Sequence, residues 1–288
     1  MTLTPPRSPL PVDPPADPPP TGSPPPRVTE MMTGPLDMLG PDSDPAPPWM
    51  LTVYLDSVVF DAETVWERVG RAVLADCGCS ELAAGTLPDP LALALAAGDL
   101  VDISEALARV IADGPGTNVT SALLRMRIFH RLSATARDGD LACPAARAFL
   151  TRAAATDARI AYLTSMPRSW VEALSEHLAL PQPHVLLTAE QVRRRRPHPY
   201  AHLLAVHQLG IPARFGVAVE SGSDGITAAM DAGLTVMAIV PPEMSGGSGR
   251  LTLVGDLADV DLAAARAAIH ADWARERAAA TPGSPDRS

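Results

Sequence analysis

Short apolar runs alternate with amphipathic stretches along most of the chain. Residues 51–55 form an apolar run that is typical of a buried strand, and from residue 62 to 76 the apolar positions recur at helical spacing. Similar strand-like runs cover residues 159–165, 184–188, 215–220, 234–240 and, as an expected edge strand, 250–256. Helical stretches separate these runs, and a last helix is expected over 262–278. Strands joined by single helices predict an α/β fold with a doubly wound parallel, Rossmann-like sheet.

One long stretch interrupts this alternation. Between residues 80 and 139 the apolar positions follow helical spacing and no strand is expected. A helical insert after the first strand would lie over the carboxyl edge of the sheet, where such folds place their ligands. We therefore expect an α/β core formed by residues 49–61 and 141–278 and an inserted helical cap domain formed by residues 62–140.

The two ends of the chain have a different composition. Residues 1–48 contain most of the 31 prolines and show no apolar periodicity, so we expect a disordered tail there. Residues 279–288 are expected to be disordered as well. Within the first tail, residues 28–40 (VTEMMTGPLDMLG) gather several apolar side chains. They are either a docking motif for a protein partner or a chance cluster.

Charge and cysteine content exclude several classes of function. The formal net charge is -10, which argues against a nucleic-acid partner, because such proteins present a basic face. No apolar run is long enough to span a membrane, so we expect no membrane partner. Three cysteines, an odd number, fit a reducing cytoplasmic location better than a disulfide scaffold. All 23 basic residues are arginine, so an arginine at an expected lysine position carries little information.

Four short stretches carry the candidate chemistry. They are YLDSVVFD at 54–61, LTS at 163–165, RRRRPHP at 193–199 and VESGSDGI at 219–226. In order and spacing they resemble the motifs of the haloacid dehalogenase (HAD) superfamily, in its β-phosphoglucomutase-like and phosphoglycolate-phosphatase-like branch. The resemblance covers about residues 50–275. It implies a hydrolase or phosphatase-like fold with a nucleophilic aspartate and an acid/base aspartate two residues later.

The first stretch departs from that pattern. In the register that we favour, Asp56 takes the acid/base position and Tyr54 takes the nucleophile position, with Ser57 at the glycine and Asp61 at the final aspartate. A phenol is neutral at pH 7 and is a poor ligand for a hard cation. The alternative register makes Asp56 the nucleophile, but it puts Val58 at the acid position.

The second and third stretches fit the resemblance better. It implies that Thr164, with Ser165, grips phosphoryl oxygens, although a hydroxyl before a helix is also a common N-cap. Arg196 stands where the family has a phosphate-binding lysine, and arginine keeps the charge that a phosphate needs. The alternative for the four consecutive arginines is a solvated basic turn.

The fourth stretch weakens the expected metal site. Glu220 occupies the first acidic position, but Ser221 replaces the second acid, which the resemblance makes a Mg²⁺ ligand. Asp224 is a weak substitute, since it would lie on the first turn of a helix and cap it. We therefore expect no cofactor, or Mg²⁺ if the chain is an active enzyme.

Three functions remain open from the sequence. The first is a pseudoenzyme of the HAD-like type that lacks phosphatase activity and binds a small phosphorylated metabolite or a protein partner. The second is an active phosphatase or phosphomutase that acts on a small phosphorylated metabolite and uses Asp56. The third is a scaffold or cargo protein that acts through the proline-rich tail.

Overall fold

The centre of the molecule is a mostly parallel sheet. The computed structural model describes residues 48–56, 58–115, 119–137, 141–241 and 246–280. Its seven strands lie in the order β3-β2-β1-β4-β5-β7-β6. They are β1 (Met50–Tyr54), β2 (Arg159–Leu163), β3 (Val185–Leu187), β4 (Gly216–Ser221), β5 (Thr235–Ile239), β6 (Gly246–Ser248) and β7 (Leu251–Val254). Every pairing is parallel except that of β6 with β7.

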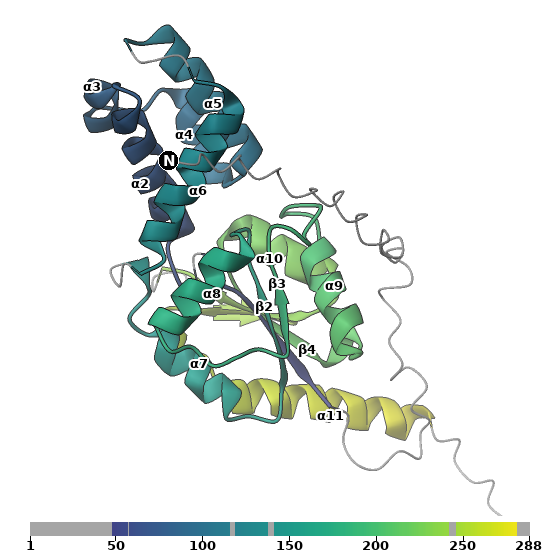
Figure 1. Ribbon diagram of the computed structural model, residues 1–288. Coiled ribbons are helices and arrows are strands. Elements are labelled where there is room, and N and C mark those ends of the chain that lie inside the picture. The colour runs from purple at the N-terminus through teal and green to yellow at the C-terminus, as the bar shows by residue number, and fades with distance from the viewer. Residues whose placement is uncertain (1–47, 57, 116–118, 138–140, 242–245, 281–288) are drawn as a thin grey trace, which may run out of the picture.

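Helices pack on both sides of this sheet (Figure 1). They are α7 (Ala146–Ala154), α8 (Arg168–His177), α9 (Tyr200–Leu209), α10 (Gly222–Asp231) and α11 (Leu262–Ala280). The helices α7, α8 and α10 follow from amphipathic stretches between apolar runs, whereas α9 is buried over most of its length. Gly233 ends the α10 segment with a φ of 86°, a left-handed conformation that glycine adopts without strain. The doubly wound parallel α/β fold is confirmed.

Five further helices follow β1. They are α2 (Ala62–Asp76), α3 (Ser80–Ala84), α4 (Asp89–Ala97), α5 (Leu100–Asp113) and α6 (Ser121–Thr135), and we call them the helical group. Figure 1 shows them standing apart from the sheet. Asp61 caps α2, since its carboxylate accepts the Thr64 backbone N–H at 3.1 Å.

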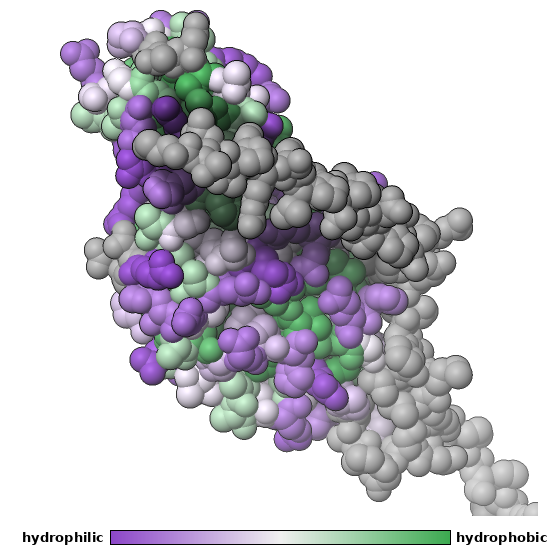
Figure 2. All heavy atoms as spheres, in the orientation of Figure 1, coloured by the Kyte–Doolittle hydropathy of each residue, from purple (hydrophilic) through white to green (hydrophobic). Residues whose placement is uncertain are grey.

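The helical group also exposes some of its apolar side chains. The large exposed apolar residues of the described chain all lie on α4, α5 and α6: Leu93, Val101, Leu123, Met126 and Phe129. Figure 2 shows hydrophobic side chains at the surface of this part, while hydrophilic ones gather across the middle of the visible face.

One strand prediction was wrong in its position. The run 250–256 forms β7, but β7 is not at the edge, because β6 pairs with it in antiparallel orientation. The sequence of β6 is Gly-Gly-Ser, which carries no apolar signal that could predict a strand. The last helix also extends to Ala280, two residues beyond the expected end.

Several expectations fall on residues outside the described part of the chain. They concern residues 1–47, the apolar segment 28–40 and most of residues 279–288, together with Ser57. Within the described residues, burial begins at Trp49, which is 1% exposed and lies next to the expected boundary at residue 48. No helix in the described ranges is long and apolar enough to cross a membrane.

Candidate functional site

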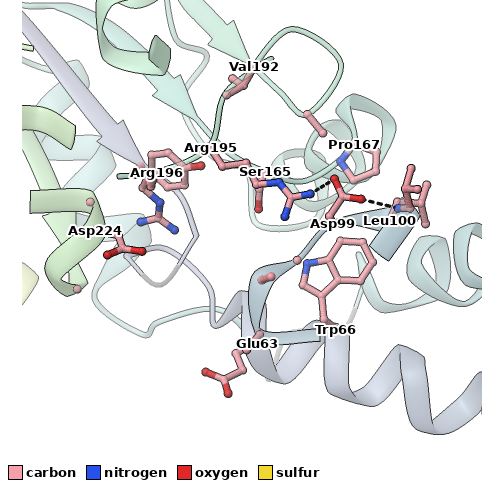
Figure 3. A pocket seen from close by; sticks show the side chains of 18 of the residues that line it. Glu63, Trp66, Asp99, Leu100, Ser165, Pro167, Val192, Arg195, Arg196 and Asp224 are labelled. Carbon is pink, nitrogen blue, oxygen red and sulfur yellow. Dashed lines mark hydrogen bonds and ion pairs between the residues drawn. The ribbon is translucent and has the colours of Figure 1, made fainter. Parts of the chain in front are cut away.

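A cavity of about 880 Å³ lies between the carboxyl ends of the strands and the helical group. Its floor comes from the ends of β1, β2 and β4 and from the loop before α9, and its other walls come from α2, α4 and α5 (Figure 3). Small-molecule sites in proteins have volumes in this range. Of the candidate residues, Tyr54, Ser165, Arg196, Ser221 and Asp224 line it.

Tyr54 is the last residue of β1 and lies at the cavity floor. Its side chain is buried, and the guanidinium of Arg196 stacks over its ring at 3.8 Å from the ring centre. Burial raises the pKa of the Tyr54 phenol well above its ordinary value, and the nearby Asp56 carboxylate raises this pKa further. The phenol therefore stays neutral at pH 7 and contributes no negative charge to the site.

Asp56 lies two residues further on, and its carboxylate is held on both oxygens. The Thr164 hydroxyl donates to Oδ1, while the Ser165 hydroxyl donates to Oδ2 and the Ser165 backbone N–H donates to Oδ2 at 2.9 Å. Asp56 is 2% exposed. Burial raises the pKa of this carboxyl, although the hydrogen bonds from Ser165 and Thr164 act in the opposite direction.

Thr164 and Ser165 therefore contribute hydroxyl groups to Asp56 and not to a helix end. The N-cap residue of α8 is Pro167, which makes no side-chain hydrogen bond. Thr164 Oγ1 also accepts the Met166 backbone N–H at 3.0 Å, which fixes the hydroxyl toward Asp56. The two hydroxyls and the Ser165 N–H form an oxyanion cradle, and the carboxylate of Asp56 occupies it.

A second group of polar contacts begins at half-buried Arg196 and ends at buried Thr52. Arg196 Nη1 donates to Glu220 Oε2 at 3.4 Å, and Glu220 Oε1 lies 2.9 Å from His202 Nε2. His202 Nδ1 in turn lies 3.2 Å from the Thr52 hydroxyl. Because a carboxylate only accepts, Nε2 is the donor toward Glu220. Glu220 is fully buried, and its two oxygens are directed to these two partners.

Gly225, on the first turn of α10, lets this pair approach the helix. A Cβ at this position would lie 2.2 Å from Glu220 Oε2 and 3.0 Å from Arg196 Nη1. The first of these distances is far inside van der Waals contact. Glycine is therefore needed here for space, since a side chain would displace Glu220 or Arg196.

The side chains at the expected metal position do not suit Mg²⁺. Tyr54 presents a neutral phenol under a guanidinium, and Ser221 presents a hydroxyl. Glu220 is directed to Arg196 and His202, while Asp224 lies exposed on the first turn of α10. In the described part of the chain, no three His, Cys, Asp or Glu side chains converge as a metal cluster. Mg²⁺ prefers several hard oxygen ligands, with carboxylates among them.

Two residues that line the cavity were not predicted from the sequence. Arg195 reaches across to the helical group and forms ion pairs with Asp99 and, at 3.6 Å, with Asp102. Within four consecutive arginines, nothing in the sequence distinguishes Arg195 from its neighbours. Trp66 belongs to the apolar stripe of α2, a pattern that predicts a core residue, yet it also lines the cavity.

The comparisons with known proteins agree on one fold. The chain matches no family model. It is 34% identical over 116 residues to hexitol phosphatase A of Escherichia coli (strain K12), a match that covers 40% of this chain and 53% of the relative's length. The matched part thus spans about half of that curated relative.

Solved structures match over a larger part of the chain at low sequence identity. CbbY of Rhodobacter sphaeroides has a TM-score of 0.57 with 20% identity, over 75% of this chain and 98% of CbbY. A family IA HAD hydrolase of Entamoeba histolytica has a TM-score of 0.58 with 11% identity, over 77% and 99%. A putative β-phosphoglucomutase of Thermotoga maritima has 0.55 with 17% identity, over 73% and 94%. The chain thus has the fold of these solved structures and, over part of its length, a sequence similar to that of a hexitol phosphatase.

Proposed function

We propose that this protein binds a small ligand in the cavity and does not transfer phosphoryl groups. The observation that carries the proposal is the replacement of the nucleophile position by Tyr54, whose neutral ring is stacked under Arg196 at 3.8 Å. A carboxylate nucleophile forms an acyl phosphate, and a buried neutral phenol offers no comparable group. The residue at the nucleophile position is thus stacked against Arg196.

The metal position supports the same proposal. Phosphoryl transfer in this fold relies on a cation that neutralises charge between the phosphate and the carboxylates of the site. At this position the chain has the Arg196 guanidinium, paired with buried Glu220 at 3.4 Å, and the hydroxyl of Ser221. The fixed guanidinium supplies positive charge, but it leaves no coordination position for an attacking or leaving oxygen.

The names of the relatives support a small metabolite as the ligand. The curated relative is a hexitol phosphatase, and a second solved structure of CbbY, that of a mutant, is a complex with xylulose-(1,5)bisphosphate. We propose that the cavity of this protein takes a molecule of similar size; the sequence led us to expect a small phosphorylated metabolite. A protein partner would instead engage the surface of the helical group or residues 28–40.

Ligand binding without metal is the test of this function. We expect members of a panel of sugars and sugar phosphates to raise the melting temperature of the full-length protein equally with Mg²⁺ and with a chelator, because Tyr54 and Ser221 present no carboxylate to a cation. A stabilisation that appears only with Mg²⁺ would contradict the proposal.

An active phosphatase is a second candidate, and the position of Asp56 favours it. Asp56 is the carboxylate that contacts both Thr164 and Ser165, the residues expected to hold a phosphoryl group. If Asp56 were the nucleophile, replacing it by Asn would abolish a measurable Mg²⁺-dependent turnover. A scaffold role would depend on the proline-rich tail, which lies outside the described residues.

A further inference from the structure

The positive charges around the cavity are already matched by carboxylates. Of the described residues that line it, two are cationic, Arg195 and Arg196, while four are acidic: Glu63, Asp99, Glu190 and Asp224. Arg195 pairs with Asp99 and Asp102, and Arg196 pairs with buried Glu220. A phosphate dianion entering this space would therefore meet an excess of negative charge and two guanidinium groups that already have partners.

The neutral donors for an oxyanion are occupied too. Both Asp56 oxygens accept from the cradle of Thr164 and Ser165, and this carboxylate is buried. To seat a phosphate there, the protein would have to displace a covalently attached carboxylate or bring two anions into one buried pocket. Either process carries a large desolvation or repulsion cost.

One donor of the cavity remains without a partner. The indole Nε1 of Trp66 is buried and has no hydrogen-bond acceptor within the described part of the chain, and the residue is 2% exposed. Figure 3 shows this nitrogen on the side of the ring that faces the cavity. A buried indole N–H without an acceptor costs free energy. A ligand oxygen placed here would accept the hydrogen bond that this N–H does not make within the described chain.

Gly98 keeps the space in front of this nitrogen open. It follows α4 with a φ of 70°, and a Cβ on Gly98 would lie 3.0 Å from Trp66 Nε1 and 3.7 Å from Ser165 Oγ. These two atoms therefore face one small space that a side chain would fill. The left-handed conformation is one that glycine adopts readily, so the opening is compatible with an unstrained backbone.

The remaining walls combine apolar groups with hydrogen-bond acceptors. Leu100, Val101 and Phe129 offer carbon surfaces, and the exposed carboxylate of Asp224 offers an acceptor for hydroxyl groups. A molecule that suits these walls has C–H faces, several hydroxyl donors, at least one acceptor oxygen and no negative charge. Sugars and polyols combine these properties.

We propose that the cavity binds an uncharged, polyhydroxylated small molecule and that the indole N–H of Trp66 donates a hydrogen bond to one of its oxygens. This inference rests on the proposed function and narrows it, because it takes the unphosphorylated molecule as the ligand. Trp66 is then a specificity-determining residue of the site, and the cradle filled by Asp56 discriminates against phosphate esters.

Titration calorimetry on the full-length protein tests this assignment. The probes are sorbitol, mannitol and glucose, each paired with its 6-phosphate, with a chelator present. We expect at least one uncharged probe to bind and its 6-phosphate to bind at least tenfold more weakly. Trp66→Phe keeps an aromatic ring and removes the donor, and we expect it to weaken binding about three- to tenfold, the usual effect of one hydrogen bond. Trp273→Phe, which removes an indole on α11 outside the cavity, is the matched control and should bind as the parent does.

The possible results separate this inference from the proposed function. Binding of a 6-phosphate as tight as that of its free partner, absence of binding by all three uncharged probes, or an unchanged affinity in Trp66→Phe would each overturn it. The first two results use the parent protein alone, so they hold even if a variant fails to fold. The proposed function fails on a different signal, the release of inorganic phosphate from a 6-phosphate when Mg²⁺ replaces the chelator.

Discussion

Among single residues, Tyr54, Arg196 and Asp56 make the contacts on which the proposed function rests. The guanidinium of Arg196 stacks on the ring of Tyr54. The carboxylate of Asp56 accepts hydrogen bonds from the hydroxyl and N–H donors of the cradle. The sequence could indicate which residue types stand at these positions. It could not indicate that Asp56 turns into the cradle, because that side-chain direction depends on Thr164, which is distant in sequence and adjacent only in the folded sheet.

Restoring two carboxylates at the strand ends should restore a metal site. We expect the double variant Tyr54→Asp and Ser221→Asp to bind Mg²⁺, while either single variant binds little, since Mg²⁺ needs several hard oxygen ligands in one geometry. Titration calorimetry with MgCl₂ measures the difference, and the two single variants are the controls. If a folded double variant binds Mg²⁺ no better than the parent, the register that we favour for residues 54–61 is wrong. Asp56 would then hold the nucleophile position.

The raised pKa of Asp56 predicts a pH-dependent stability. Burial raises its pKa in the folded state above the ordinary value, so between those two values the folded state binds more protons than the unfolded state. The contribution of Asp56 to stability therefore falls as pH rises through that window, and it stays low above the folded-state pKa. Asparagine does not ionise, so the stability of Asp56→Asn does not fall with pH through this group.

We therefore expect the melting temperature of Asp56→Asn minus that of the parent to be larger at pH 7 than at pH 4. Melting curves at several pH values measure this difference, and taking the difference cancels the titration of the other carboxylates. Asp231→Asn, an exposed change on α10, is the control and should show no such trend. A difference that shrinks as pH rises would show that the hydrogen bonds from the cradle outweigh the burial of Asp56.

Among the secondary structure elements, apolar runs are enough to predict most strands and helices. They fail where a strand is short and polar, as in β6, because the hydrogen bonds to β7 form it without any apolar side chain. They also cannot assign a role to Trp66, because a residue on the apolar stripe of α2 can face the core and the cavity at once. The contact that separates these roles is tertiary.

The first turn of α10 should tolerate no side chain at Gly225. In Gly225→Ala the new Cβ would lie 2.2 Å from Glu220 Oε2, and Glu220 is fixed by Arg196 and His202. Overpacking typically costs about 1–3 kcal/mol, while the better helix propensity of alanine returns up to about 1 kcal/mol. We expect a net loss of about 1–2 kcal/mol in the free energy of unfolding, measured in urea. Ser223→Ala, on the same turn but exposed, is the control, and equal stability of the two variants would contradict the close approach.

For the molecule as a whole, the fold was predictable from the sequence, whereas the prediction for residues 1–48 falls almost entirely outside the described part of the chain. Among the described residues, the packed core begins at Trp49, whose indole N–H donates to Asp157 Oδ1 at 2.7 Å. Deletion of residues 1–47 keeps this contact. We expect the melting temperature to change by no more than about 2 °C, because a proline-rich segment without apolar periodicity buries little surface. A larger decrease would mean that the tail packs on the core, whereas a deletion through Trp49 should destabilise the protein and serves as the positive control.

For the whole molecule, we propose that this fold retains the frame of a phosphoryl-transfer site without its nucleophile and metal ligand. The most direct measurement is phosphate release from an aryl phosphate and from hexitol 6-phosphates by the full-length protein, with Mg²⁺ and with a chelator. We expect no release above background in either condition, and no difference between the parent and Asp56→Asn. Release that requires Mg²⁺, disappears with the chelator and is absent in Asp56→Asn would contradict it.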